Sequence, residues 1–462
     1  MRRGYTRRMS LTRRDFLMRS AAVSVGFAGL STALANRACS RAGPLFIEDG
    51  FGPLVPDPDG IFDLPAGFSY KVISRAGDEM DDGLIVPGQP DGMAAFPGSD
   101  GLTIVVRNHE MERGFNKPGP FGHEHERLAL VNPEFIYDAG GEGGPSRGGT
   151  TTIVYDTKSR RLVRQFLSLA GTERNCAGGM TPRGTWLTCE ETVVRRTDGF
   201  GQDHGWVFEV PATLHPSLTK PVPLRAMGRF YHEACATDPR TGIVYMTEDR
   251  PDGLLYRFIP HRPDDLSQGG RLQALKVTGS PRLDTRNWEV RTLSPRSVLP
   301  CEWIDIEGVE APDDDLRYRG HEGGAARFAR GEGMWFGHDA VYFACTNGGD
   351  ARCGQIFRLT PGATASEGDT LELFVESPGP GVIEKADNIT FAPWGDMIVC
   401  EDGKDDQFLL GITPTGGVYR LGRNAAGASE LAGACFSPDG STLFVNILGD
   451  GMTLAIHGPW GS

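Results

Sequence analysis

Residues 176–191 read CAGGMTPRGTWLTCEE, two short apolar runs separated by a Pro-x-Gly turn and closed by two carboxylates. This pattern predicts a strand, a tight turn and a second strand. In an antiparallel hairpin, the start of the first strand lies beside the end of the second. Cys176 is therefore expected to lie close to the glutamates that close the stretch.

The same pattern recurs five more times along the chain. The copies are residues 92–110 (GMAAFPGSDGLTIVVRNHE), 233–248 (EACATDPRTGIVYMTE), 332–347 (EGMWFGHDAVYFACTN), 387–402 (DNITFAPWGDMIVCED) and 433–446 (GACFSPDGSTLFVN). Each copy tends to place Asp, Glu, Asn or Cys where the first strand starts or the second one ends. Six hairpins of this kind are expected to bring a ring of ligand-type side chains to one place.

A glycine followed by aromatic and β-branched residues comes after most of these hairpins, and predicts a third strand. The runs are 205–210 (GWVFEV), 253–258 (GLLYRF), 354–359 (GQIFRL) and 417–421 (GVYRL). Three or four strands repeated six times are typical of propeller blades. We therefore predict an all-β fold: a six-bladed β-propeller with a metal site at one mouth of its central channel.

The composition fits an all-β protein, since 63 glycines and 32 prolines among 462 residues leave little room for long helices. The formal net charge is −13, and it becomes −19 without residues 1–35, which carry seven arginines and one aspartate. Such a charge argues against nucleic-acid or anionic-membrane partners. If the substrate is an anion, bound cations must reverse the field locally.

The first 35 residues resemble a twin-arginine export signal. Residues 12–18 (TRRDFLM) precede the apolar run 21–34, and residues 33–35 (ALA) form a cleavage site. The run is shorter than the roughly 20 residues that a spanning helix needs. We expect recognition by the twin-arginine export machinery, a periplasmic or secreted location, no stable membrane anchor, and a monomeric single domain over residues 36–462.

Nine cysteines are present, an odd number that leaves at least one unpaired in an exported chain. Cys189, Cys345 and Cys400 lie within strand runs, which favours small buried hydrophobic roles. Cys345 and Cys353 are also candidates for a local disulfide. Cys176 differs because it starts a hairpin next to two glycines, where backbones can approach a ligand closely.

Candidate metal ligands at the hairpin ends are Glu110, Cys176, Glu190, Glu191, Glu233, Glu248, Glu332, Asp387 and Asp402. Carboxylates gathered in one cavity repel each other and are costly to bury unpaired. Multivalent cations would neutralise them. Carboxylate and amide oxygens favour calcium, and a thiolate draws a transition metal. The alternative for any single carboxylate is a salt bridge at a strand end.

Arg330 lies two residues before Glu332 and thus at the same mouth. A guanidinium matches phosphate geometry bidentately, although Arg330 has many carboxylates with which it could pair instead. Arg107 and Lys385 are further candidates for substrate binding. No G-x-S-x-G nucleophile elbow is present in the sequence.

Taken together, several motifs resemble the PhoX family of bacterial alkaline phosphatases. They are Asn175-Cys-Ala-Gly-Gly, residues 184–191 (GTWLTCEE), residues 228–233 (GRFYHE), residues 245–249 (YMTED), Arg330-x-Glu332-Gly and Ala386-Asp-Asn388. The resemblance covers most of the chain after the export signal. It implies a six-bladed propeller, export through the twin-arginine route, ferric and calcium ions at the mouth, and hydrolysis of phosphomonoesters.

Residue roles follow from this resemblance by motif. Cys176 would bind iron as a thiolate, and Arg330 would hold the phosphate of the substrate. Arg330 and Glu332 are the implied catalytic residues. The implied metal ligands are Glu191, Glu248, Glu332, Asp387 and Asn388, with weaker assignments for Glu110, Glu190, Glu233 and Asp402.

Two departures concern the substrate site. The chain is shorter than the well-known phosphatases of the family, and Arg183 stands where tryptophan is common. Both affect the expected substrate range more than metal binding. Two alternatives remain open: a calcium-dependent propeller lactonase or esterase, which needs neither Cys176 nor Arg330, and a non-catalytic calcium-binding propeller.

Overall fold

The computed structural model describes residues 45–140, 143–362 and 368–460, so the expected export signal lies outside the described residues. These residues are mostly strands, with α2 (Leu316–Glu322) as the one α-helix among them. The prediction of an all-β chain is confirmed. None of the described helices has both the length and the apolar character needed to cross a bilayer.

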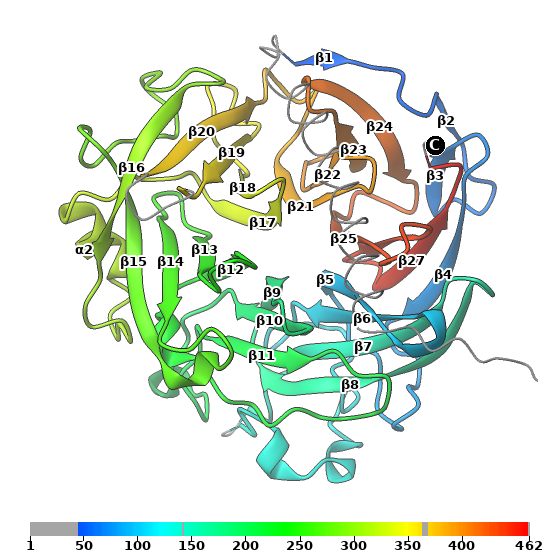
Figure 1. The fold of residues 1–462 in the computed structure, drawn as a ribbon. Coiled ribbons are helices and arrows are strands. Elements are labelled where there is room, and N and C mark those ends of the chain that lie inside the picture. The colour runs from blue at the N-terminus through cyan, green and yellow to red at the C-terminus, as the bar shows by residue number, and fades with distance from the viewer. Residues whose placement is uncertain (1–44, 141–142, 363–367, 461–462) are drawn as a thin grey trace, which may run out of the picture.

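The strands form five sheets arranged around a common axis, and neighbouring strands are antiparallel except where β1 pairs with β24 (Figure 1). One sheet contains β5 (Pro90–Pro97), β6 (Leu102–His109), β7 (Gly148–Asp156) and β8 (Arg161–Thr172). The next contains β9 (Asn175–Met180), β10 (Thr185–Glu190) and β11 (Val207–Pro211). A nine-stranded sheet contains β12 (His232–Thr237), β13 (Val244–Glu248), β14 (Leu255–Pro260), β15 (Gly270–Val277), β16 (Val298–Asp305), β17 (Gly331–Gly337), β18 (Ala340–Cys345), β19 (Gln355–Thr360) and β20 (Asp369–Glu376).

The remaining two sheets contain both the N-terminal and the C-terminal strands. The seven-stranded sheet contains β21 (Ala386–Phe391), β22 (Met397–Glu401), β23 (Phe408–Ile412), β24 (Gly417–Asn424), β3 (Phe62–Pro65), β2 (Leu54–Val55) and β1 (Phe46–Ile47). The last sheet contains β25 (Leu431–Phe436), β26 (Leu443–Ile447), β27 (Met452–His457) and β4 (Ser69–Arg75). Short 3₁₀ turns lie in the connections: η1 (Ser99–Gly101), η2 (Leu128–Leu130), η3 (Pro133–Phe135), η4 (Arg196–Asp198), η5 (Arg225–Met227) and η6 (Leu266–Gln268).

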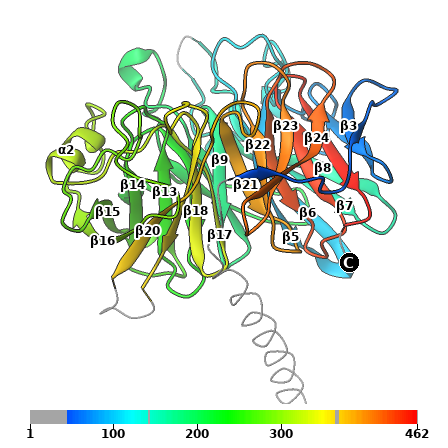
Figure 2. The same ribbon diagram turned by 90° about the horizontal axis from the view of Figure 1, so that it is seen from above.

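All six predicted hairpins are present, as β5–β6, β9–β10, β12–β13, β17–β18, β21–β22 and β25–β26. Their first strands contact one another in the cyclic order β5, β9, β12, β17, β21, β25 and back to β5. Figure 1 shows these strands near the centre of the molecule, with the later strands of each sheet farther out. In the view turned by 90°, α2 lies at the outer edge (Figure 2).

The ring is closed by a pairing between the two ends of the described chain. β4 pairs with β27 in antiparallel register, from Ser69↔His457 to Arg75↔Met452. The sheet that begins with β25 is therefore completed by a strand from the start of the chain. Such a closure removes an exposed sheet edge.

The hydrophobic core lies between neighbouring sheets. Phe343 and Phe357 pack with Tyr245 between the two halves of the nine-stranded sheet, and Phe444 packs against Ile153 across β26 and β7. Related clusters fill the other spaces between neighbours in the ring. Each sheet thus buries both faces only because it has a neighbour on each side.

Two expectations are corrected in the outer strands and loops. The run 417–421 is not a third strand, because β23 (Phe408–Ile412) comes between it and the hairpin. Cys345 and Cys353 are both free thiols rather than a disulfide. Cys189, Cys345 and Cys400 are buried within apolar clusters, as predicted.

Candidate metal centre

The first strand of every hairpin carries a β-bulge close to its start. The residues paired just before the irregularity include Pro90↔His109, Asn175↔Glu190, His232↔Glu248, Gly331↔Cys345 and Ala386↔Glu401. In these five hairpins the next two residues of the first strand face one residue of its partner. A bulge re-aims side chains, and here it places one ligand-type residue per hairpin at the same level. We call these residues the inner ring: Asp91, Cys176, Glu233, Glu332 and Asp387.

The sixth hairpin differs because its bulge falls later, after Ala432, and it contributes no ligand-type residue to the inner ring. A second set of carboxylates lies at the same end of the hairpins, beside the ends of the second strands. Each follows the last residue of a second strand, or, for Glu430, precedes a first strand. We call them the outer carboxylates: Glu110, Glu191, Asp249, Asp402 and Glu430.

The inner ring and the outer carboxylates form one continuous cluster. The Cys176 Sγ lies 3.1 Å from Glu233 Oε1 and 3.4 Å from Asp91 Oδ2. Ligand atoms of Glu110, Cys176 and Glu191 all lie within 4.8 Å of one another. The same is true of Glu233, Glu332 and Asp387, which come from three different hairpins. Both triads have the spacing that one cation needs.

Burial of this cluster makes ionisation of its acids costly. Burial, followed by repulsion from neighbouring carboxylates, raises the pKa of Glu233, of Glu332 and of Asp91 well above the ordinary value. Burial, followed by the charge of Asp402, raises the pKa of Asp387 to about 7. Burial and the charges of Asp91 and Glu233 likewise raise the pKa of the Cys176 thiol. The cluster needs either protons or positive charge to be stable.

Two buried carboxylate oxygens of the inner ring, Asp91 Oδ1 and Glu233 Oε2, have no hydrogen-bond partner among the described residues. An unsatisfied buried acceptor of this kind is costly, and a bound cation removes that cost. The donor set also has a clear chemical preference. Its carboxylate oxygens suit hard ions such as calcium, and the thiolate of Cys176 suits a transition metal. The residues therefore fit a mixed metal centre.

Cys176 is held in place by the neighbouring hairpin. The Asn108 side-chain amide donates to the carbonyl oxygens of Cys176 and Ala177, at 3.1 and 2.7 Å. The indole Nε1 of Trp186 donates to Asn108 Oδ1 at 2.8 Å. Gly92 allows the two strands to approach, because a Cβ at this position would lie 2.5 Å from the Cα of Ala177. The thiol position is thus fixed by buried contacts on β5, β6 and β10.

Two arginines approach the cluster. Arg330 donates from Nε and Nη2 to the two oxygens of Asp249, at 2.8 and 2.6 Å, and its Nη2 lies 3.0 Å from Glu332 Oε1. Arg174 lies 3.0 Å from both Glu110 Oε1 and Glu191 Oε2, through its Nε. Each guanidinium is therefore in contact with one triad of possible metal ligands.

Glu190 and Glu248 are not brought to the cluster. Glu190 accepts hydrogen bonds from the backbone amides of Glu173, Gly205 and Trp206, and it contacts His204. Glu248 accepts from the Leu254 amide and the Tyr256 hydroxyl. Side chains alternate along a strand, so these glutamates face away from the residues that follow them. Both connect the second strand of a hairpin to the start of the third.

Arg107 is also separate from the cluster. It is fully buried in β6, where it donates to the hydroxyls of Thr151 and Thr453. Lys385 lies two residues before Asp387, and its backbone carbonyl accepts from the Asp402 amide. Lys385 makes no ion pair with any residue that the structure describes. It remains a candidate at the mouth, whereas Arg107 is a buried structural residue.

Asn388 supports the cluster in a different way from the predicted one. Its Oδ1 accepts from the Gly433 amide at 2.7 Å, and its Nδ2 donates to Asp387 Oδ1 at 2.9 Å. The amide oxygen is therefore engaged by the backbone of the next hairpin. Asn388 orients the carboxylate of Asp387.

Sequence reasoning missed Asp91, Asp249 and Glu430. Asp91 and Glu430 each lie a few residues before the start of the repeat as it was read, and Asp249 lies one residue after its end. Extending the six repeats by a few residues at both ends reveals all three acids. When the six repeats are aligned, Glu191 matches Asp249 and Asp402, whereas Glu248 matches Glu190. This alignment identifies the outer carboxylates.

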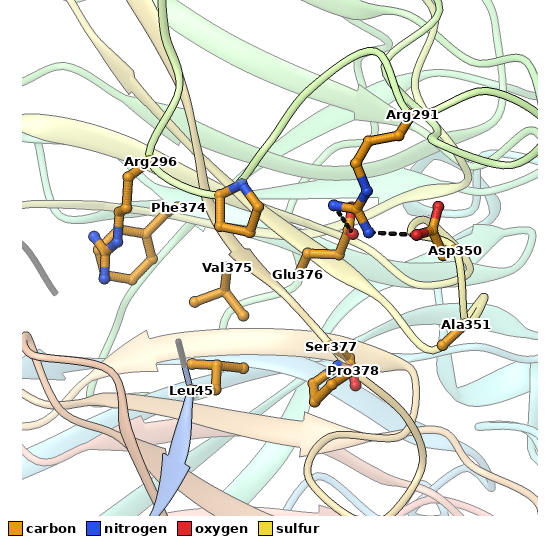
Figure 3. Close-up of a pocket in the computed structure, with 11 residues that line it drawn as sticks. Leu45, Arg291, Arg296, Asp350, Ala351, Phe374, Val375, Glu376, Ser377 and Pro378 are labelled. Atoms are coloured by element: carbon orange, nitrogen blue, oxygen red, sulfur yellow. Dashed lines mark hydrogen bonds and ion pairs between the residues drawn. The ribbon is translucent and has the colours of Figure 1, made fainter. Parts of the chain in front are cut away.

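A surface pocket lies apart from this cluster, at the edge of β20 (Figure 3). Leu45, Phe374 and Val375 are among its apolar lining residues. Its Arg291 pairs with Glu376, at 2.8 Å, and with Asp350. The charges of this pocket are matched internally, and it includes no member of the inner ring.

Comparison with known protein families gives one match, described as "Alkaline phosphatase PhoX", over residues 49–451. The matched range includes the whole inner ring and all of the outer carboxylates. A search of curated protein sequences finds no significant match.

Among solved structures, PhoX of Pseudomonas fluorescens in complex with vanadate, a transition-state analogue, is similar with a TM-score of 0.64. The identity is 19%, and the match covers 90% of this chain and 97% of that chain. A Xanthomonas campestris gluconolactonase is 11% identical, with coverage of 90% and 99% and a TM-score of 0.36. Virginiamycin B lyase of Staphylococcus aureus is 12% identical, with coverage of 84% and 99% and a TM-score of 0.40.

Proposed function

We propose that this chain, which belongs to the alkaline phosphatase PhoX family, is a metal-dependent phosphatase that hydrolyses phosphomonoesters. The observation that carries the proposal is the inner ring itself. Five bulged strands bring one thiol and four carboxylates together, and two buried oxygens of this set have no partner among the described residues. A guanidinium that can bind phosphate lies beside them.

The architecture that we propose is a six-bladed β-propeller with this centre at one mouth. The closed cycle of first strands supports six blades, as do the apolar clusters between neighbouring sheets. In this arrangement β15 and β16 connect two blades through a continuous sheet. The P. fluorescens structure supports the overall fold.

The residues fit ferric and calcium ions, the metals that the family resemblance implies. Cys176, Glu110 and Glu191 would hold an ion that accepts a thiolate, and Glu233, Glu332 and Asp387 would hold a second ion. When bound, such ions polarise phosphoryl oxygens and lower the pKa of water. The ions would also neutralise the repulsion that raises the pKa values of these acids.

Arg330 is the residue that we assign to the phosphate. Asp249 receives two of its N–H groups, which fixes the plane of the guanidinium beside Glu332. A guanidinium held in this way can donate to two oxygens of a phosphoryl group and stabilise the charge that develops there. Glu332 belongs to the second triad and also contacts Arg330, so it links substrate binding to the metal site.

The test begins with the exported protein purified without chelator. Iron and calcium are measured by mass spectrometry, and p-nitrophenyl phosphate turnover is measured before and after calcium removal. Iron and calcium together, with turnover that falls on calcium removal and recovers on its return, are the expected result. Calcium without iron and without phosphate release would contradict the phosphatase and favour a lactonase or a calcium-binding propeller.

Two variants assign the roles within this centre. Cys176→Ser should lose iron and retain calcium, because a neutral hydroxyl is a much weaker ligand for a transition metal than the anionic thiolate that it replaces. Arg330→Ala should retain both metals and lose turnover by about 10²- to 10³-fold, the usual effect of removing one transition-state donor. Cys353→Ser is the matched control, since this thiol donates only to the Ala351 carbonyl.

We also propose export of the chain as a monomer through the twin-arginine machinery to the periplasm or beyond. The proposal depends on residues 1–35, with their paired arginines and cleavage site. Replacement of Arg13 and Arg14 by lysine should keep the protein in the cytoplasm. Fractionation followed by immunoblotting would show the location.

A further inference from the structure

A backbone hydrogen bond is repeated at the mouth of all six hairpins. The residue that follows each second strand donates its amide to a carbonyl just before the bulge of the first strand, and in five of the six hairpins this carbonyl lies two residues before the inner-ring residue. The acceptors are Gln89, Arg174, Tyr231, Arg330, Lys385 and Glu430. We call the location of these acceptors the rim position; in the sixth hairpin, where the bulge falls later, Glu430 lies three residues before the bulge residue Gly433.

Four rim residues have a left-handed backbone although none of them is glycine. The φ values are 47° for Gln89, 52° for Arg174, 50° for Arg330 and 56° for Lys385. A positive φ costs a residue with a side chain about 1–3 kcal/mol and is concentrated at functional sites. Three of these four residues are cations, in a chain whose net charge is −13. The rim thus keeps cationic side chains in a backbone conformation that glycine would adopt more easily.

Arg174 and Arg330 are matched in more than position. The exposed fractions of their side chains are 33% and 31%, so both reach the solvent at the mouth. Each contacts one of the two triads of possible metal ligands, Arg174 through Glu191 and Arg330 through Glu332. Arg174 pairs with Glu191 and Arg330 pairs with Asp249, and these two outer carboxylates follow the second strands of neighbouring hairpins. The two guanidiniums therefore pair with equivalent acids of neighbouring hairpins.

We propose that Arg174 is a second substrate-binding arginine, which contacts the phosphoryl group together with Arg330. This inference rests on the proposed phosphatase function. Arg174 now lies between three carboxylates, those of Glu110, Glu112 and Glu191. Metal ions held by Glu110 and Glu191 would neutralise the charges that Arg174 faces. Its N–H groups would then be available to an anion at the mouth.

The test compares Arg174→Gln and Arg174→Lys with the wild type. Glutamine occupies the same rim position in the first hairpin, so the first variant is compatible with the local backbone. Arg291→Gln is the matched control, because Arg291 also bridges two carboxylates but lies in the separate pocket of Figure 3. For each protein we would measure iron and calcium content, binding of inorganic phosphate by calorimetry, and kcat and KM for p-nitrophenyl phosphate.

With Arg174→Gln we expect an unchanged metal content and a Kd for phosphate that rises about 10- to 100-fold, as for loss of a charged hydrogen bond. KM should rise with it, and Arg174→Lys should recover part of the loss. An unchanged Kd in Arg174→Gln would overturn the inference and leave the phosphatase intact. A parallel loss of metal would also overturn it, because Arg174 would then only balance the charge of the ligands.

The binding measurement separates this inference from the proposed function. A wild type that binds phosphate without hydrolysing p-nitrophenyl phosphate would contradict the phosphatase, and Arg174→Gln would still decide the role of Arg174. A wild type with its metals that binds no phosphate would overturn both.

Discussion

Adjacent acids at the hairpin ends have opposite environments, and Glu248 and Asp249 illustrate this. Glu248 faces the third strand and accepts from the Leu254 amide and the Tyr256 hydroxyl. Asp249 faces the mouth and receives two N–H groups from Arg330. Because side chains alternate along a strand, two consecutive acids face different surroundings: Glu248 contacts the third strand, and Asp249 contacts Arg330.

This difference predicts opposite effects of two conservative changes. Asp249→Asn should lower kcat/KM by about 10- to 100-fold, because it removes the charged partner that orients Arg330. Glu248→Gln should leave kcat/KM within about twofold and lower the free energy of unfolding by about 1–3 kcal/mol. Turnover of p-nitrophenyl phosphate and urea denaturation would measure the two effects. Loss of turnover in Glu248→Gln with normal folding would contradict the assignment.

At the scale of the elements, the β-bulge explains what sequence reasoning could and could not find. Alternating apolar residues and Pro-x-Gly turns predicted all six hairpins and four of the five inner-ring residues. A bulge inserts one residue and shifts the alternation of side chains beyond it, so the side chain that faces the mouth cannot be read from a strict alternation. Glu190 and Glu248 end second strands, and they were misassigned because adjacent side chains there face opposite ways. Asp91 was missed because it lies one residue before its repeat.

The bulged strands pack so closely that glycine is required beside the inner ring. A Cβ on Gly333 would lie 2.6 Å from the Cα of Asn388, on the next hairpin. Gly333→Ala should separate β17 from β21, lower the metal content, and cost about 1–3 kcal/mol through overpacking. Gly381→Ala is the control, because nothing lies within 4 Å of its Cβ position. Equal metal content in the two variants would show that this close approach is not needed.

A buried histidine contacts the second hairpin where β10 ends. His204 lies between Glu190, at 2.6 Å, and Asp138, at 3.2 Å, and is fully buried. Burial alone lowers the pKa of His204, but Glu190 and Asp138 outweigh it and raise the pKa to about 10. The imidazolium form therefore connects β10 to the loop before β11.

This pKa predicts a dependence of stability on alkaline pH. The folded value lies above the 6.5 of the unfolded chain, so the contribution is complete below pH 6.5 and is lost as the pH rises through 10. The free energy of unfolding should fall between pH 7 and pH 10. In His204→Gln the same decrease should be smaller, as measured by urea denaturation at several pH values. Identical slopes for both proteins would argue against a charged His204.

At the scale of the whole molecule, the candidate site depends on closure of the ring. The inner ring runs from Asp91 to Asp387, and β4 pairs with β27 only when the two ends of the described chain meet. Pairing over such a sequence distance leaves no local pattern, which is why it was not predicted. Since neighbouring sheets bury each other's faces, opening the ring anywhere would alter the spacing of the ligands.

The ring geometry also predicts that metal binding and stability are coupled. Glu233, Glu332 and Asp387 belong to three different hairpins, so one ion held by them connects three parts of the ring. Removal of this ion leaves their buried carboxylates to repel each other. A ligand at about 1,000 times its Kd stabilises the folded state by about 4 kcal/mol. Chelation should therefore lower the thermal unfolding midpoint, and added calcium should restore it.

The variant Glu332→Gln provides the comparison for this experiment. Glutamine keeps the size of the side chain but removes one charged ligand, so the ion should bind more weakly. The wild type should show a large shift of the midpoint on chelation, and the variant a smaller one at the same metal concentration. Chelation that removes the metals without moving the wild-type midpoint would contradict this coupling. The acids of the inner ring would then be stable as a protonated cluster, as their raised pKa values would allow.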